Sequence, residues 1–154
     1  AGYSLVSTAT EGNMRLISVV MGTASKNARL AESKKLLNFG FRFYETLSPN
    51  KKDQTIETEK VWMGDTDTVN LGVAENTYVT LPRSQAKDLK ASFVLTKELK
   101  APITKDEVVG KLTYRVGDQD VAEYPLVALN DVKEGSLFSR MVDYVMMLVQ
   151  SWFK

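Results

Sequence analysis

The sequence contains no cysteine and no histidine. These two absences exclude disulfide bonds, thiolate nucleophiles, zinc sites of the Cys/His type and Ser-His-Asp triads. Apolar runs are also short, and none approaches the roughly 18 consecutive apolar residues of a membrane-spanning helix. The 20 Lys/Arg and 19 Asp/Glu residues nearly balance, which gives no reason to expect nucleic-acid binding. What remains is a 154-residue chain, 44% hydrophobic and 25% charged, with the composition of a folded globular protein.

Charge and turn residues divide the chain into three blocks. Residues 1–46 carry 6 basic and 3 acidic side chains, residues 47–135 carry 12 and 15, and residues 136–154 carry 2 and 1. The two borders coincide with sequences typical of turns or linkers, at residues 48–52 and 134–136. We therefore expect the chain to be organised as these three consecutive segments.

The first block predicts a β-hairpin followed by a helix. Residues 3–10 and 13–21 have the pattern of two strands, and the second has apolar residues on both faces, which indicates a strand covered on both sides. Residues 28–44 have helical spacing of apolar side chains, with Asn27 as the expected N-cap. Two strands and one helix cannot bury a proper core alone, so this block needs a partner outside it.

The second block predicts a small all-β domain. Strand-like runs recur about every ten residues between turn signals, which is typical of a β-sandwich or small barrel. The runs are residues 55–62, 67–71, 77–81, 91–95, 107–116 and 121–129. The 15 acidic residues raise the question of a metal site, but no Asp-x-Asp-x-Asp-Gly loop is present and Asp65 and Asp67 form an isolated pair. We expect neither a metal nor a cofactor.

The third block predicts an amphipathic helix with a narrow polar side that includes Arg140 and Asp143. Each of these charges would cost about 2.5–3.5 kcal/mol inside lipid, so lying in a membrane interface is favoured over spanning. From the residues alone, a helix in a protein core or an oligomer contact is an equally good interpretation. The residues expected to contact lipid are Leu137, Phe138, Met141, Val145, Leu148, Val149, Trp152 and Phe153.

A series of short motifs resembles one protein family along essentially the whole chain. Ala1-Gly2-Tyr3 and Ala9-Thr10-Glu11-Gly12-Asn13-Met14-Arg15-Leu16-Ile17-Ser18 resemble the stretch after the Lys-Thr-Gly box of D-alanyl-D-alanine carboxypeptidases, the low-molecular-mass penicillin-binding proteins of the type-5 class. The match continues at Arg29, Ala31-Glu32-Ser33-Lys34-Lys35, Gly40-Phe41-Arg42-Phe43, Val61-Trp62, Gly64-Asp65, Leu71-Gly72-Val73, Lys87-Asp88-Leu89-Lys90 and Trp152-Phe153.

The resemblance implies a fold and a function for each block. Residues 1–46 would be an α+β remnant, the hairpin and helix of a transpeptidase-like domain. Residues 47–135 would be an all-β, sandwich-like domain, and residues 136–154 an amphipathic membrane-anchor helix. The parent protein would be a serine-type carboxypeptidase that trims the terminal D-Ala of peptidoglycan pentapeptides and is acylated by β-lactams. It would lie at the periplasmic face of the bacterial inner membrane, attached peripherally.

The family's chemistry uses Ser-x-x-Lys, Ser-x-Asn and Lys-Thr-Gly boxes, and the resemblance puts all three upstream of Ala1. Ser-x-x-Lys does occur at residues 48–51, 84–87 and 151–154, but in a linker, a loop and the terminal segment. None of these contexts provides the cleft in which a lysine amine takes the serine proton. We therefore expect no catalytic residue in this chain, which should be inactive without the N-terminal catalytic portion as its partner.

Arg29 is the one substrate-binding residue that the resemblance carries over. It matches the basic residue that, in this family, meets the terminal carboxylate of the substrate beside the Lys-Thr-Gly strand. A guanidinium suits a carboxylate because it offers two parallel donors and a permanent charge. The alternative for Arg29 is a solvated side chain in the first helical turn. For the whole chain, the alternative is a non-catalytic, membrane-associated β scaffold or interaction module.

Overall fold

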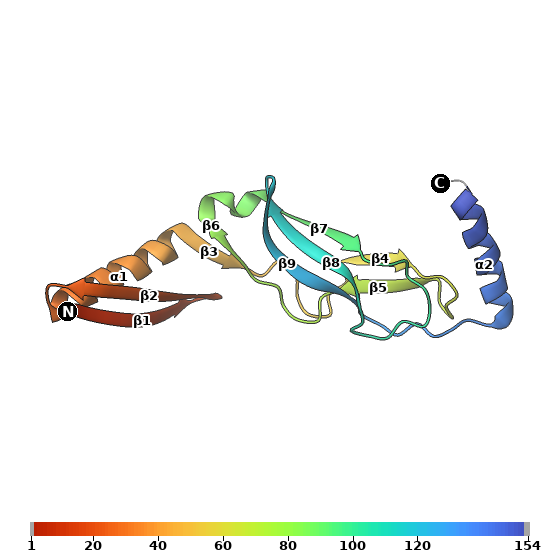
Figure 1. Cartoon of the computed structure of the whole chain (residues 1–154), viewed down its shortest axis with the longest axis horizontal. Coiled ribbons are helices and arrows are strands. Elements are labelled where there is room, and N and C mark those ends of the chain that lie inside the picture. The colour runs from red at the N-terminus through yellow and green to blue at the C-terminus, as the bar shows by residue number, and fades with distance from the viewer. Residues whose placement is uncertain (1, 153–154) are drawn as a thin grey trace. The chain divides into compact units, whose positions relative to one another are not determined.

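The computed structural model describes residues 2–152, apart from the side chains of Ser139, Gln150 and Trp152 (Figure 1). The chain forms two compact units. The first unit consists of the residues up to 49 together with residues 78–89, and the second of residues 50–77 and the residues from 90 onward. These two units differ from the three consecutive blocks expected from the sequence. The expected domain borders, between residues 46 and 47 and between residues 135 and 136, stay a prediction.

The first unit begins with the predicted hairpin. Strands β1 (Tyr3–Glu11) and β2 (Met14–Thr23) pair antiparallel, and the turn contains Gly12 at a φ of 56°, a left-handed conformation that glycine adopts without strain. One face of β2 carries the buried residues Met14, Ser18 and Val20. The opposite face was expected to be covered as well, but within this chain it is exposed.

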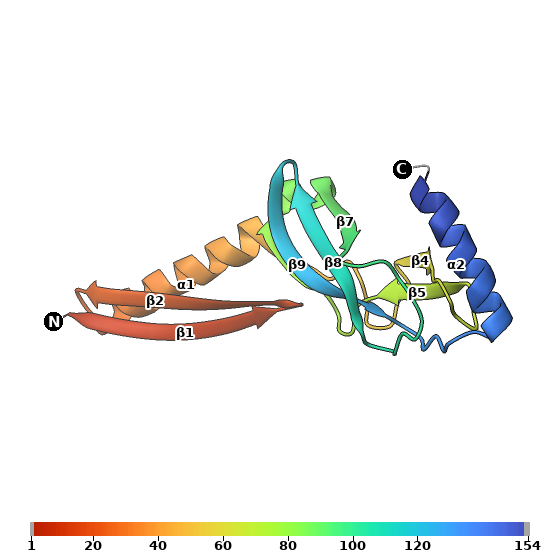
Figure 2. The same ribbon diagram turned by 45° about the vertical axis from the view of Figure 1, so that its right-hand side comes forward.

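Helix α1 (Lys26–Phe43) packs along one face of the hairpin (Figures 1 and 2). Gly40 allows a close approach, because a Cβ at this position would overlap the side chain of Leu16 on β2. The expected N-cap, Asn27, is wrong. Ser25 caps the helix instead, with extended backbone and its hydroxyl accepting a hydrogen bond from the Ala28 N–H at 3.0 Å. Asn27 lies inside the first turn.

Two short strands complete the first unit. β3 (Tyr44–Leu47) follows α1 directly and pairs antiparallel with β6 (Val79–Pro82), after which the chain forms the 3₁₀ helix η1 (Arg83–Asp88). The strand pattern at residues 77–81 predicts β6, but β3 has no such signal because the helical pattern runs to residue 44 and a turn sequence begins at residue 48. Arg83 links these elements, because its Nη2 donates to the Phe41 carbonyl at 3.1 Å and its Nη1 lies 3.6 Å from Glu45.

The second unit is built on one curled, five-stranded sheet (Figure 2). Its order is β4-β5-β9-β8-β7, and the pairs β4–β5, β5–β9 and β8–β9 are antiparallel. The strands are β4 (Glu57–Lys60), β5 (Thr68–Gly72), β7 (Leu89–Leu95), β8 (Val108–Val116) and β9 (Gln119–Ala128). The prediction is confirmed in that the unit is mostly β with a curled sheet, whereas a second packed sheet, as in a sandwich, is not found among the described residues.

The curl of the sheet follows from irregular pairing between β8 and β9. The register shifts twice along this pair, between Val108 and Gly110 and between Tyr114 and Arg115. Such shifts increase the local twist, so that a single sheet can wrap around its own apolar face. The core on that face includes Val69, Leu71, Val109, Leu112, Leu126 and Ala128, all at most 1% exposed.

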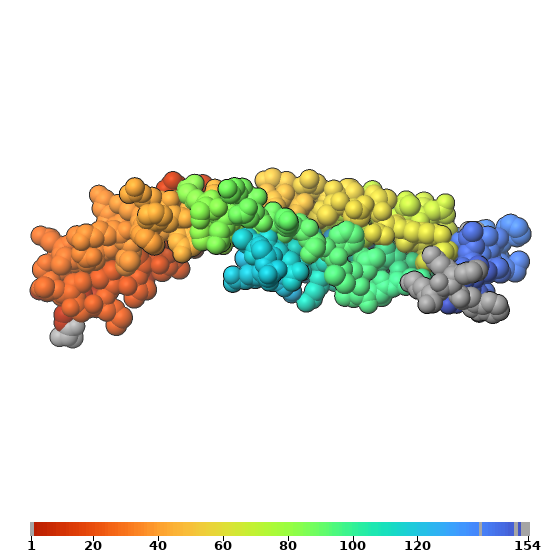
Figure 3. Space-filling model, turned by 90° about the horizontal axis from the view of Figure 1, so that it is seen from above, coloured from red at the N-terminus to blue at the C-terminus, as the bar shows by residue number. Residues whose placement is uncertain are grey.

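Helix α2 (Leu137–Trp152) ends the described chain. In Figure 3 its blue atoms lie at the end of the chain, next to the second unit's sheet region. None of the helices in the described part of the chain combines the length and apolar character needed to cross a membrane. Phe153, one of the expected lipid contacts, lies outside the described residues, as does the side chain of Trp152.

Candidate functional site

Arg29 lies in the first turn of α1 and reaches back to the beginning of β1. Its Nη1 donates to the carbonyl oxygen of Ser4 at 3.0 Å, and its guanidinium carbon lies 5.9 Å from the centre of the Tyr3 ring. The side chain is half-buried and bonded to the protein, while its substrate contact stays a prediction. Tyr3, Ser4 and Arg29 together form the candidate site.

The candidate site depends on a close crossing of the chain at the open end of the hairpin. Gly2 and Gly22 have φ values of 69° and 70°, and a Cβ on Gly2 would lie 2.7 Å from the Gly22 Cα. No other residue fits there without moving the backbone. Next along the chain, the Thr23 hydroxyl donates to the Tyr3 carbonyl at 2.9 Å, and Ser25 then starts the helix. These contacts fix the position from which Arg29 extends.

The electrostatics of the site favour an anion. The first turn of α1 contains no acidic residue, so the positive end of the helix is not neutralised by its own side chains. The Arg29 Nε is buried and has no hydrogen-bond partner in the described structure. A guanidinium beside a helix N-terminus can bind a carboxylate or another planar anion. The site offers recognition of charge, but Tyr3, Ser4 and Arg29 include no activated nucleophile.

The serine–lysine pairs found in the sequence lie away from this site. Ser48 and Lys51 follow β3 in the stretch that leads into the second unit, and Ser84 and Lys87 are exposed on η1. Ser151 is in the last turn of α2, and Lys154 lies outside the described residues. Among the described residues, no group of three or more Asp, Glu, His or Cys side chains is placed to hold a metal ion.

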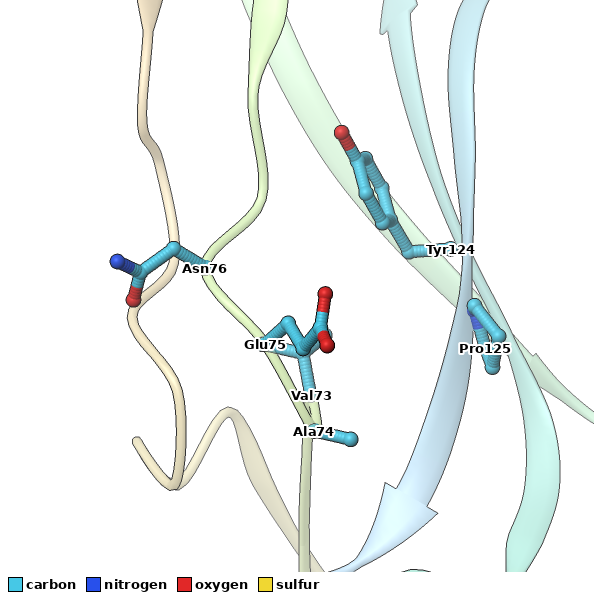
Figure 4. Close-up of a pocket in the computed structure, with 6 residues that line it drawn as sticks. All are labelled: Val73, Ala74, Glu75, Asn76, Tyr124 and Pro125. Atoms are coloured by element: carbon cyan, nitrogen blue, oxygen red, sulfur yellow. The ribbon is translucent and has the colours of Figure 1, made fainter. Parts of the chain in front are cut away.

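A small pocket lies on the second unit (Figure 4). Tyr124 and Pro125 on β9 lie across from residues 73–76, and the cavity volume is about 230 Å³. Its lining is mostly apolar and contains one carboxylate, that of Glu75. Ligand pockets generally measure about 300–1,000 Å³ and hold several convergent polar groups. This pocket is therefore a weaker candidate for a ligand-binding site than the surroundings of Arg29.

Helix α2 presents most of its expected lipid-contact residues to the outside. Leu137, Phe138, Met141, Val145, Leu148 and Val149 have exposed fractions between 47% and 84%. The polar side of the helix has a role that its sequence does not reveal. Asp143 accepts a hydrogen bond from the Met63 backbone N–H at 2.7 Å, a contact between residues 80 positions apart for which the sequence holds no local signal.

The sequence profile of the family described as "Penicillin-binding protein 5, C-terminal domain" matches residues 44–134. The chain belongs to this family. The match begins at the first residue of β3, so the family's domain includes β3 and β6 as well as the curled sheet. The resemblance inferred from the short sequence motifs is confirmed.

Relatives among curated proteins extend the match to the rest of the chain. The chain is 48% identical to D-alanyl-D-alanine carboxypeptidase DacC and 47% identical to D-alanyl-D-alanine carboxypeptidase DacA, both of Escherichia coli K12. Each alignment covers 99% of this chain but only 38% of the relative, so the chain spans well under half the length of these proteins. It corresponds to the C-terminal part of such penicillin-binding carboxypeptidases.

A solved structure supports the fold directly. Penicillin-binding protein 5 from Haemophilus influenzae matches with a TM-score of 0.79 and 41% sequence identity, over 87% of this chain and 40% of that chain. The mostly β architecture with a curled sheet is therefore shared with a relative of known structure.

Proposed function

We propose that this chain is the C-terminal part of a serine-type D-alanyl-D-alanine carboxypeptidase. In this proposal, the first unit closes one side of the catalytic sheet and supplies Arg29 to the substrate, the second unit supports it, and α2 attaches the enzyme to the membrane. The observation that carries the proposal is the family match together with the buried, unpartnered Nε of an arginine at a helix N-terminus.

The parent enzyme would remove the terminal D-Ala from peptidoglycan pentapeptides. An upstream serine attacks the carbonyl carbon of the terminal D-Ala-D-Ala amide, and its proton passes to a neighbouring lysine. This proton is delivered to the D-Ala nitrogen as the C–N bond breaks, so that D-Ala leaves as a free amine and an acyl-enzyme forms. Water then hydrolyses the ester, whereas a β-lactam stops at the acyl stage. Arg29 binds the carboxylate of the leaving D-Ala, so that the reacting carbonyl is held near the serine.

The exposed apolar face of the hairpin supports an N-terminal catalytic portion as the partner. On β2, Ile17, Val19 and Met21 are 57% to 77% exposed, although they form one continuous apolar stripe. Exposed stripes of this kind usually mark an interaction surface. In the parent enzyme this stripe would be covered by the remainder of the transpeptidase-like domain.

Arg29→Ala in the full-length enzyme tests the substrate contact. Loss of one charge-assisted hydrogen-bonded pair should lower kcat/KM about ten- to a hundredfold for D-Ala-D-Ala peptides that end in a free carboxylate. Peptides with an amidated terminus should lose far less, and Arg29→Lys should retain part of the activity because it keeps the charge. Equal losses with both peptides would contradict the proposed role of Arg29.

Helix α2 is proposed to hold the enzyme peripherally at the periplasmic face of the inner membrane. Its exposed apolar side chains would enter the boundary between headgroups and acyl chains, where each contributes at most about 1.5–3 kcal/mol. Because apolar area supplies most of this attachment, high salt should release little protein and detergent should release all of it.

Vesicle flotation with and without residues 136–154 tests the attachment. The full chain should float with vesicles of phosphatidylethanolamine and phosphatidylglycerol, and the shortened chain should stay in the soluble fraction with its sheet intact by circular dichroism. If both chains stay soluble, α2 is a protein-packing helix and the membrane proposal is wrong.

A further inference from the structure

Within the second unit, helix α2 turns the side that carries Arg140 and Asp143 toward the rest of the unit. Arg140, Asp143 and Met147 follow each other at helical spacing and are half-buried, whereas the large apolar side chains around them are exposed. A helix packed as part of an ordinary soluble core has the opposite arrangement, with the apolar stripe inside. The polar side chains therefore serve to attach the helix to the protein.

The attachment centres on the backbone of Met63. Its N–H donates to Asp143 Oδ2 at 2.7 Å, and its carbonyl accepts from the Gly135 N–H at 2.9 Å. Met63 has a φ of 60°, a left-handed conformation that residues other than glycine rarely adopt. One residue of the second unit thus binds both the chain leading into α2 and the second turn of the helix itself.

The segment before α2 is also fixed. Asp65 N–H donates to the Lys133 carbonyl at 2.8 Å, and the Lys133 N–H donates to Asp65 Oδ1 at 2.9 Å. Glu134 then accepts a hydrogen bond from Arg140 Nη1 at 2.8 Å, which ties the start of the helix to the segment before it. Residues 133–135 therefore do not act as a free linker between the sheet and the helix.

We propose that Asp143, supported by Arg140, clasps α2 to the second unit and so holds the apolar side of the helix in one orientation toward a lipid surface. The partner in this inference, a lipid bilayer, rests on the proposed membrane attachment. The contact between Asp143 and Met63 needs no membrane and is present in solution. Its consequence is that the second unit stands on the membrane at a defined angle instead of swinging on a flexible tether.

Hydrogen exchange in solution tests the clasp without any membrane. In the full chain, Asp143→Ala should lower the exchange protection of the Met63 amide about ten- to a hundredfold, because the N–H loses a charged acceptor. Asp143→Asn keeps an acceptor oxygen and should retain most of the protection. Circular dichroism of both variants checks that α2 remains helical.

Asp131→Ala is the matched control for this experiment. Asp131 Oδ1 accepts from the Lys105 backbone N–H at 2.7 Å, so the variant removes a similar carboxylate–amide bond elsewhere in the same unit. It should reduce protection at Lys105 and leave Met63 unchanged. If Asp143→Ala leaves the Met63 amide as protected as before, the clasp does not exist and the proposal fails.

Distance measurements on vesicles test the orientation. Since the chain has no cysteine, Asp118→Cys and Met146→Cys introduce one pair of spin labels, on the β8–β9 turn and on α2. On vesicles of phosphatidylethanolamine and phosphatidylglycerol, the distance distribution should be narrow, and adding Asp143→Ala should broaden it while flotation is retained. An unchanged narrow distribution in that variant overturns the clasp. Failure of the unaltered chain to float overturns the membrane attachment instead, with the exchange result still judging the clasp.

Discussion

The Tyr114 hydroxyl donates a hydrogen bond to Asn50 Oδ1 at 2.5 Å, and the Thr77 hydroxyl lies 2.9 Å from the same oxygen of Tyr114. Asn50 and Thr77 are the first and last residues of one stretch of the second unit. The Thr77 N–H also donates to the Asn50 carbonyl at 3.0 Å. Burial raises the pKa of the Tyr114 hydroxyl, which keeps it neutral and able to donate. Tyr114 of β8 thus links Asn50, where the chain enters the second unit, to Thr77, where the chain leaves it for the first unit.

Tyr114→Phe should destabilise the protein by about 1–3 kcal/mol, because the half-buried Asn50 and the buried Thr77 lose a shared hydrogen-bond partner while the ring stays in place. The free energy of unfolding in urea measures this change. Tyr144→Phe is the control, since Tyr144 is 56% exposed on α2, and it should change stability by less than about 0.5 kcal/mol. Equal stability of the two variants would show that this network contributes nothing.

Ser25→Ala should cost about 1 kcal/mol, because the N-terminal turn of α1 loses its capping acceptor. Asn27→Ala is matched to it, lying two residues further along in the same turn, and should be neutral or slightly stabilising because alanine is the better helix former. Thermal unfolding followed at 222 nm compares them. If Asn27→Ala lowered the melting temperature more than Ser25→Ala, Asn27 would be the N-cap, as the sequence pattern predicted.

Glu107 should make stability fall in acid. Its carboxylate accepts from Lys97 Nζ at 2.6 Å and from the Thr104 N–H at 3.1 Å, and the Lys97 contact, followed by Thr104, lowers the pKa of Glu107. The pKa of Glu107 in the folded protein lies below its unfolded value of about 4.3. The contribution of Glu107 to stability is therefore complete above about pH 4.3 and is lost as the pH falls through the folded-state pKa.

Urea unfolding between about pH 6 and pH 3 measures this dependence. Glu107→Gln should be less stable than the unaltered chain at the upper end and should lose less stability on acidification. Lys97→Met removes the main donor and should give an intermediate pH dependence. A Glu107→Gln variant whose stability follows pH as the unaltered chain does would rule out this carboxylate as the source.

The 154-residue chain should not be acylated by a fluorescent penicillin. Ser84 and Lys87 are exposed on a short 3₁₀ helix, and Ser48 and Lys51 lie in a connecting stretch, so neither pair lies in a cleft that could activate the serine. Gel fluorescence after incubation, with a complete carboxypeptidase as the positive control, gives the answer. Stoichiometric labelling at Ser48 or Ser84 that hydroxylamine reverses would refute this prediction.

Local sequence signals predicted the elements whose formation depends on residues close together in the sequence. The hairpin of residues 3–21, the helix over most of residues 28–44 and the strand-like runs 107–116 and 121–129 follow from periodicity and turn residues, and the structure contains an element at each. Strand β3 was missed because its four residues directly continue a helix and gain their partner, β6, more than thirty positions later. The family resemblance predicted Arg29 as a site residue, but only the structure gives its bond to the Ser4 carbonyl.

The helix N-cap and the α2 contact show two further limits. Asn27 and Ser25 are both good capping residues, and the choice depends on which backbone is extended, a property set by how β2 ends. The sequence pattern showed that α2 has a narrow polar side but predicted no protein contact for Asp143. The structure instead pairs Asp143 with a backbone N–H in the left-handed turn at Met63, which no spacing rule anticipates.

Residues 78–89, which form β6 and η1, belong to the first unit although the segments on either side of them belong to the second. This arrangement determines how the protein can be cut or recombined. The chain passes between the units three times, after residues 49, 77 and 89. A protease that cleaves between Ser48 and Lys52 would produce two polypeptides, yet β3 would remain hydrogen-bonded to β6 on the other piece. The nicked protein should therefore migrate as two bands under denaturing conditions and elute as one species in native buffer. A chimera that exchanges the second unit between relatives must likewise carry residues 78–89 with the first, so that the border follows the fold and not the sequence order.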